Sequence, residues 1–98
     1  MTVHRLVVIR GRVQGVGYRA WTEVAALERS LQGWVRNRRD GSVEALFIGL
    51  EDDVAAMIAA CRNGPPGARV DFVDHREAGA AEVALRRRDE LFSVLGNV

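Results

Sequence analysis

The stretch GRVQGVGYR, residues 11–19, decides how the beginning of this chain folds. It places three glycines within seven residues and closes on a tyrosine and an arginine. An apolar, β-branched segment at 3–13 leads into this stretch, and a segment of helical character begins within it at Tyr18. Glycine adopts left-handed backbone angles without a steric penalty. The stretch therefore predicts a strand, a tight loop and a helix in direct succession.

The segment after the loop repeats apolar residues at helical spacing, which predicts a helix over 18–31. Glu23 and Glu28 are expected to face solvent, and Gly33 is expected to end the helical pattern. The residues expected on the buried stripe are Trp21, Val24, Ala25, Leu27 and Leu31.

A hairpin is predicted next, with strands at 34–37 and 42–49, because Asp40-Gly41 is typical of a tight turn. A second helix follows from Glu51, since three acidic residues there favour the positive end of a helix dipole. The sequence NGPPG at 63–67 ends this helix. Its predicted buried stripe is Val54, Met57, Ile58 and Cys61.

The remaining segments are a strand at 68–75, a segment at 76–90 that fits either a loop or a short helix, and a closing strand at 91–95. In the strand at 68–75, Val70 and Phe72 are expected to face one way, with charged residues facing the other. The order is β-α-β-β-α-β with a fifth strand. It predicts an α+β, ferredoxin-like βαββαβ sandwich, with a mostly antiparallel sheet of four to five strands and two helices on one face.

Composition describes an ordinary globular chain. Its 98 residues are 48% hydrophobic and carry a formal net charge of +1, so we expect a single domain over 1–98 and no nucleic-acid or membrane partner. All 14 positive residues are arginine, and Cys61 is the sole cysteine. A cysteine-based zinc site and an internal disulfide are thereby excluded. A cytoplasmic monomer is the expectation.

Several interpretations of the glycine loop compete. A Walker A loop requires a lysine, which this chain lacks. Gly15, Gly17 and Ala20 match a dinucleotide fingerprint, but Asp40, the acidic residue at the right distance, lies in a predicted hairpin turn. A plain tight turn is the simplest interpretation. Arg19 at the start of a helix favours another, in which backbone amides and a guanidinium cradle a phosphate.

Two further stretches accompany the loop, namely GWVRNRRDGSVEALFIG at 33–49 and GPPGARVDFV at 64–73. Together they resemble the acylphosphatase family over residues 5–75. The resemblance implies a ferredoxin-like fold and hydrolysis of acyl phosphates, small carboxyl-phosphate anhydrides, without a metal or cofactor. It also implies that Asn37 positions the attacking water, and that Arg19 holds the phosphoryl group with the backbone amides of Gln14, Gly15, Val16, Gly17 and Tyr18.

The chemistry of the residues agrees with these roles. A carboxylate is a good leaving group, so binding, orientation and charge stabilisation suffice without a strong base. A guanidinium and a ring of amides would stabilise charge on the transferred phosphoryl group. The Asn37 amide both donates and accepts hydrogen bonds, which suits it to hold a water.

The same residues are compatible with other structures and functions. Asn37 could form a turn, and the domain could be a non-catalytic phosphate-binding or regulatory module of the same fold. An RNA-binding module shares the element order, but it needs exposed aromatics on its central strands, and only Phe47 is offered. His4 and His75 are far apart in sequence and show no metal-ligand spacing. The segment 76–90 is also longer than the short loop by which family members reach their last strand.

Overall fold

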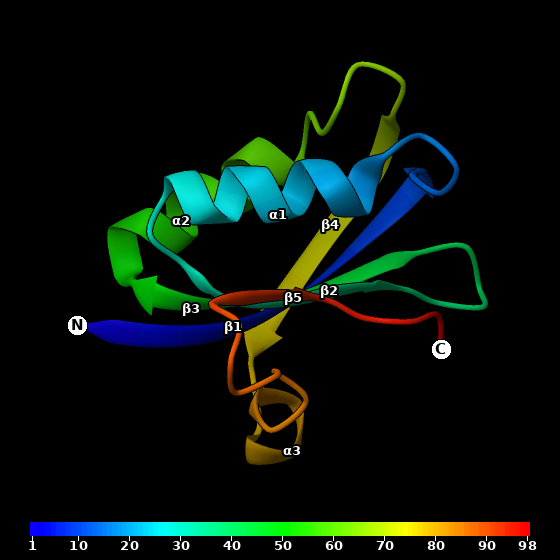
Figure 1. The fold of residues 1–98 in the computed structure, drawn as a ribbon. Helices are drawn as coiled ribbons and strands as arrows, with labels where there is room; N and C mark the ends of the chain where they lie inside the picture. Colours follow the sequence, from blue (N-terminus) through cyan, green and yellow to red (C-terminus); the bar gives the residue numbers. More distant parts are fainter.

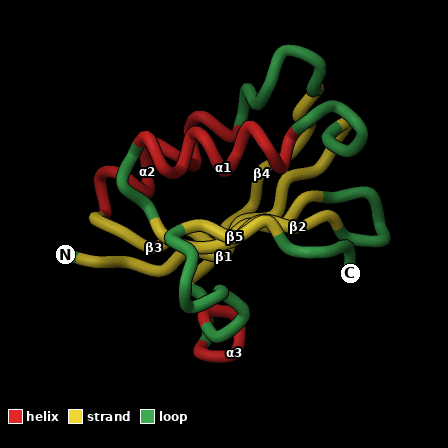
Figure 2. The backbone as a smooth tube through the Cα atoms, in the orientation of Figure 1, coloured by secondary structure: helices red, strands yellow, loops and turns green.

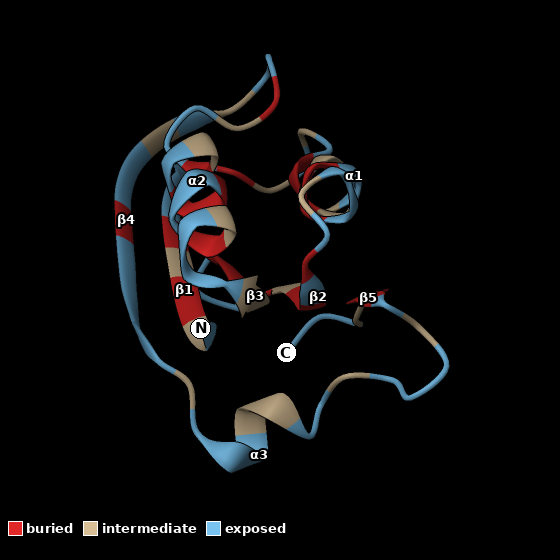
Figure 3. Cartoon of the chain, turned by 90° about the vertical axis from the view of Figure 1, so that its left-hand side faces the viewer, coloured by how far each residue is buried: buried red, intermediate tan, exposed pale blue.

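The computed structural model describes residues 1–98 as one five-stranded sheet in the order β4-β1-β3-β2-β5. Helices α1 and α2 lie side by side over one face, and the short α3 lies beyond the other face (Figures 1 and 3). The elements are β1 (Thr2–Arg12), α1 (Tyr18–Glu28), β2 (Gln32–Asn37), β3 (Val43–Leu50), α2 (Glu51–Cys61), β4 (Arg69–Glu77), α3 (Ala80–Val83) and β5 (Phe92–Val94). The expected ferredoxin-like α+β sandwich is confirmed.

The sheet is antiparallel except at one edge. β1 pairs antiparallel with both β3 and β4, β2 pairs antiparallel with β3, and β5 joins β2 in parallel. The backbone tube in Figure 2 shows the long loop 84–91 that makes this parallel return possible. None of the helices combines the length and the apolar character needed to cross a membrane.

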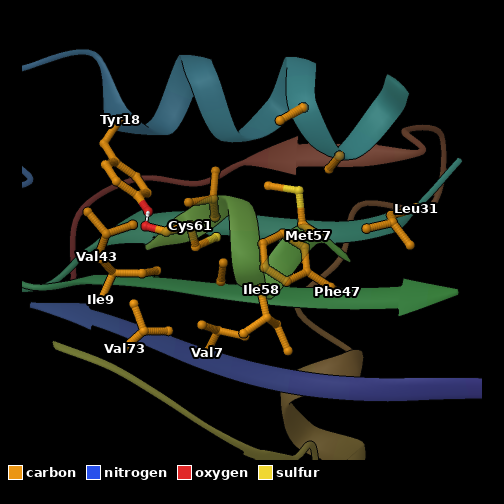
Figure 4. Close-up of a cluster of buried hydrophobic side chains, with 14 of the residues drawn as sticks. Val7, Ile9, Tyr18, Leu31, Val43, Phe47, Met57, Ile58, Cys61 and Val73 are labelled. Carbon is orange, nitrogen blue, oxygen red and sulfur yellow. Dashed lines mark hydrogen bonds between the residues drawn. The ribbon is translucent and has the colours of Figure 1, made fainter. Parts of the chain in front are cut away.

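The main core lies between the helices and the sheet. Side chains from both layers meet there, including Met57, Ile58 and Cys61 of α2 (Figure 4). The predicted α2 stripe, which also includes Val54, is buried as expected. Phe47 is fully buried in this core and stacks on Phe92, with ring centroids 6.0 Å apart. It cannot stack on a base, so the one aromatic that the RNA-binding alternative offered is lost.

A smaller core lies on the opposite face, formed by Leu6, Trp34 and Leu46. The segment 76–90 explains it, because Ala78 and Val83 pack against this cluster. The Trp34 indole donates a hydrogen bond to the Glu82 carbonyl at 2.7 Å. The segment contains the short helix α3 and is a cover for the second face of the sheet.

The first helix is shorter than its apolar pattern predicts. α1 ends at Glu28, and Ser30 takes a left-handed φ of 59° while the Leu31 amide donates back to the Ala26 carbonyl. Gly33 therefore does not end the helix; it lies within β2 at φ 143°, where a Cβ would stand 1.8 Å from the Leu46 carbonyl oxygen. Close approach of neighbouring strands, not helix termination, requires this glycine.

The buried face of α1 also differs from the expected stripe. Val24 and Leu27 are 57% and 43% exposed, whereas the buried residues are Tyr18, Thr22, Ala25 and Ala26. The inner face of α1 thus carries Tyr18 and small side chains, while Val24 and Leu27 lie on its outer side.

The expected alternation in β4 is interrupted. The register of β1 against β4 shifts between Arg10 and Gly11, which leaves Asp71 opposite no residue. Val73 is consequently buried against the core, while Phe72 is 56% exposed on the other side. A one-residue bulge reverses which side chains point inward.

The β2–β3 hairpin turns as predicted. Gly41 has a φ of 92°, and the Asp40 carboxylate accepts hydrogen bonds from the Ser42 amide at 2.9 Å and hydroxyl at 2.6 Å. These bonds, with Arg10 nearby, lower the pKa of Asp40 to about 2. Asp40 is committed to the turn, so the dinucleotide interpretation fails.

Candidate active site

The loop between β1 and α1 alternates the sign of its φ angles. Gly15 and Gly17 have φ values of 73° and 81°, and no non-glycine residue of the loop has a positive φ. A Cβ added at either glycine would meet nothing within 4 Å, so backbone conformation alone demands glycine there. Alternating φ signs turn successive N–H groups toward the same side, which is the geometry of an anion-binding nest.

No acceptor within the chain takes the amides of this loop. The backbone N–H groups of residues 14–20 donate no hydrogen bond to any backbone or side-chain acceptor. α1 begins after Gly17 with no side-chain cap and no acidic residue in its first turn. Helix starts ordinarily carry such a cap. Seven consecutive free donors at a positive helix end make a site prepared for an anion.

A cavity of about 350 Å³ opens beside these amides. It brings together the loop, the first turn of α1, the end of β2 and the last strand. Its lining residues are Val13, Gly15, Gly17, Tyr18, Arg19, Ala20, Glu23, Asn37 and Val94. The glycine loop and the strand end that carries Asn37, which are far apart in sequence, therefore line the same cavity.

Arg19 enters the cavity from the second position of α1. One guanidinium nitrogen donates to the side-chain oxygen of Asn97 at 3.2 Å. The remaining N–H groups of Arg19 have no acceptor in the chain, so they are available to an anionic ligand.

Asn37 is the last residue of β2 and is only 8% exposed. It pairs with Val43, and its carbonyl accepts a hydrogen bond from the Val98 amide at 3.0 Å. The alternative in which Asn37 forms the turn is therefore wrong. Its side-chain amide makes no hydrogen bond within the chain, yet no side-chain polar atom is both sealed from solvent and unpaired. The amide is thus free to hold a ligand or a water in the cavity.

Gln14 and Val16 have free amides in the loop, but their side chains do not line the cavity. Val16 packs against the main core. The Gln14 side chain reaches the hairpin, where it donates to the carbonyls of Arg38 and Ser42.

Tyr18 lines the cavity and packs its ring into the main core. Its hydroxyl donates to the Cys61 carbonyl at 2.6 Å (Figure 4). Burial and the adjacent Cys61 raise the pKa of Tyr18 far above its ordinary value, and burial raises the pKa of the Cys61 thiol to about 12. Both groups stay protonated at neutral pH and neither is a nucleophile.

Glu23 lines the cavity, although the helical pattern predicts that it faces solvent. The available signal was its position four residues after Arg19, because residues at that spacing share a helix face. Its carboxylate gives the otherwise positive site one negative group.

A larger cavity, of about 640 Å³, is lined by α2, by the start of β1 and by the end of β4. His4 and His75 both line it despite their separation in sequence, and His75 Nδ1 accepts a hydrogen bond from Arg5 at 2.7 Å. No cluster of three His, Cys, Asp or Glu side chains suited to a metal occurs in the chain. The start of α2 beside this cavity carries Glu51, Asp52 and Asp53, which disfavour an anion there, so size is a poor guide to the site here.

Proteins of similar sequence indicate which activity this site supports. The sequence profile of the acylphosphatase family matches residues 5–86. The chain belongs to the acylphosphatase family. An acylphosphatase of Bradyrhizobium diazoefficiens is 64% identical over 92 residues, which cover 94% of this chain and 93% of that protein.

Solved structures of similar fold support the same family. An acylphosphatase from Bacillus subtilis superimposes with a TM-score of 0.82 at 34% identity, covering 97% of this chain and 99% of that chain. The full-length HypF structure, described as phosphate- and nucleotide-bound, gives 0.81 at 26% identity, but only 12% of that chain is covered. The near-complete matches to acylphosphatases favour the enzyme over the non-catalytic alternative. The protein is an acylphosphatase-type enzyme that hydrolyses acyl phosphates.

Proposed function

We propose that the amides of Gln14 to Tyr18 and the Arg19 guanidinium hold the phosphoryl group, and that Asn37 positions the attacking water. The observation that carries the proposal is the run of seven free N–H groups beside a cavity lined by Arg19 and Asn37. A phosphoryl group supplies the oxygen acceptors that these donors lack.

The reaction then follows in one displacement. The water oxygen forms a bond to phosphorus while the bond between phosphorus and the acyl oxygen breaks. The electron pair of that bond leaves with the carboxylate, and the water proton passes to a phosphoryl oxygen. Arg19 and the amides stabilise the charge on the equatorial oxygens. The Asn37 amide oxygen accepts a hydrogen bond from the water, which orients its lone pair toward phosphorus.

We also propose that residues 1–98 act as a single-domain monomer in the cytoplasm. One sheet carries both hydrophobic clusters, which supports a single domain. The large exposed apolar side chains come from α1, β3, β4, the loop 84–91 and the chain ends, and this scatter along the chain supports a monomer. The buried free thiol of Cys61 suits a reducing compartment. Sedimentation at micromolar concentration tests the oligomeric state.

The test of the site is hydrolysis of a simple acyl phosphate in EDTA, with a phosphate monoester as the comparison substrate. We expect Arg19→Ala to abolish turnover and phosphate binding while the fold persists. Asn37→Ala should lower kcat by about 10² while phosphate still binds. Arg62→Ala removes an exposed arginine elsewhere on the surface and serves as the matched control.

Two outcomes would contradict the proposal. Turnover retained by Arg19→Ala would remove that residue from the chemistry. A wild-type chain that phosphate stabilises against unfolding, but that hydrolyses no acyl phosphate, would point to the non-catalytic phosphate-binding alternative.

A further inference from the structure

The Gln14 side chain connects the two halves of the site. Its amide nitrogen donates to the Arg38 carbonyl at 2.8 Å and to the Ser42 carbonyl at 2.9 Å. Both N–H groups of the side chain are therefore used, and the contact is partly buried. These acceptors lie 24 and 28 residues further along the chain, at the base of the β2–β3 hairpin.

The two carbonyls flank the residue that the proposed chemistry needs. Arg38 directly follows Asn37, and Ser42 directly precedes Val43, the strand partner of Asn37. The Arg38 amide itself donates to the Ser42 carbonyl at 2.9 Å, which closes the hairpin at this point. The Gln14 side chain thus binds the hairpin immediately beyond the Asn37–Val43 pair.

No other partly buried polar contact joins the loop to the hairpin. The paired register of β1 with β3 ends at Ile9 and Val43, and no backbone hydrogen bond runs from residues 13–17 to residues 37–42. Arg10 and Asp40 form an ion pair at 3.2 Å, but both side chains are nearly half exposed, and such pairs contribute little.

We propose that Gln14 is a positioning residue that sets the location of Asn37 relative to the phosphate-holding amides. The inference rests on the proposed function, in which Asn37 positions the attacking water. Without the Gln14 side chain the amides and Arg19 remain able to bind phosphate, but the water is no longer held in line. A misplacement near 1 Å is enough to cost catalysis heavily.

The test uses Gln14→Met, which keeps the length of the side chain and removes both donors. We expect kcat for a simple acyl phosphate to fall about tenfold, with inhibition by inorganic phosphate changed by about twofold at most. In an Asn37→Ala background the same substitution should change kcat by less than about twofold, because nothing is left to position. Gln14→Asn, which keeps the donors on a shorter side chain, replaces the methionine variant if that variant does not fold.

Asp40→Asn is the matched control, since it weakens the turn bonds to Ser42 in the same hairpin and leaves both carbonyl acceptors of Gln14 in place. It should lower the melting temperature and leave kcat unchanged. An equal loss of kcat from Gln14→Met in both backgrounds, or a loss of stability alone, overturns the positioning role. Full activity of Asn37→Ala by itself instead overturns the water role of Asn37, so the two failures are distinguishable.

Discussion

Arg19 and Asn97 lie 78 positions apart in sequence, yet the Arg19 guanidinium donates to the Asn97 side-chain oxygen at 3.2 Å. The next residue, Val98, donates its amide to the Asn37 carbonyl at 3.0 Å. Two consecutive residues after β5 therefore each contact one of the two residues assigned to the chemistry. The segment after β5 contacts both residues proposed for the chemistry and helps to orient them.

Asn97→Ala tests this orientation. Loss of the acceptor frees one end of Arg19, and ordering it again on binding costs part of the affinity. We expect KM and the inhibition constant for inorganic phosphate to rise about two- to fivefold, with kcat little changed. Steady-state kinetics measure both quantities, and Asn63→Ala, in an exposed loop, is the control. Unchanged or tighter phosphate binding would show that the contact does not prepare Arg19.

Glu23→Gln tests the negative group in the cavity. A carboxylate beside a bound dianion repels it, so its removal should lower the inhibition constant of phosphate about threefold. The decisive comparison is with Glu28→Gln, which makes the same change in net charge at an exposed position of α1. Because the mechanism needs no base, kcat should not fall. A drop of about tenfold or more would instead show that the Glu23 carboxylate takes part in proton transfer.

Gly17→Ala tests the backbone of the loop. An added methyl meets no atom, so the cost comes from the φ of 81° alone and should be about 1 kcal/mol of unfolding free energy. Relaxation toward a negative φ would also turn the amides away, which should weaken phosphate binding. Urea titrations with and without phosphate measure both effects, and Gly96→Ala is the reference, since its φ is not positive. A stable variant with unaltered phosphate binding would contradict the nest geometry.

Asp40→Asn tests the hairpin turn through pH. The carboxylate pKa falls from its ordinary 3.8 to about 2, because Ser42 and Arg10 favour its charged form. This stabilisation is present above about pH 4 and is lost as the pH falls toward 2. The variant should unfold at lower urea concentration than the wild type at pH 7, and the difference should shrink by pH 2. Asp74→Asn is the control, because the Asp74 carboxylate makes no hydrogen bond or ion pair within the chain, and it should show no such trend. A difference between Asp40→Asn and the wild type that stays constant with pH would refute this account of the turn.

Local patterns were enough to predict the order of elements, the glycine loop and the Asp40 turn. Each depends on residues within a few positions of one another, where periodicity and turn chemistry act directly. Arg19 and Asn37 came from motifs, and the structure places both in one cavity. The buried face of α1 was predicted less well, because the sheet beneath a helix, not its own period, decides which side chains are covered.

By itself, the sequence determined the ferredoxin-like order and the unusual backbone of residues 14–18, because glycine positions and apolar periods are local properties. Only the tertiary structure decided that the Gln14 side chain hydrogen-bonds the hairpin, that Glu23 lines the site and that Asn97 accepts a hydrogen bond from Arg19. It also decided that Trp34 is covered by the segment around α3. These contacts join residues 24 to 78 positions apart, except for Glu23, and they exist only because packing of helices and strands brings their elements together.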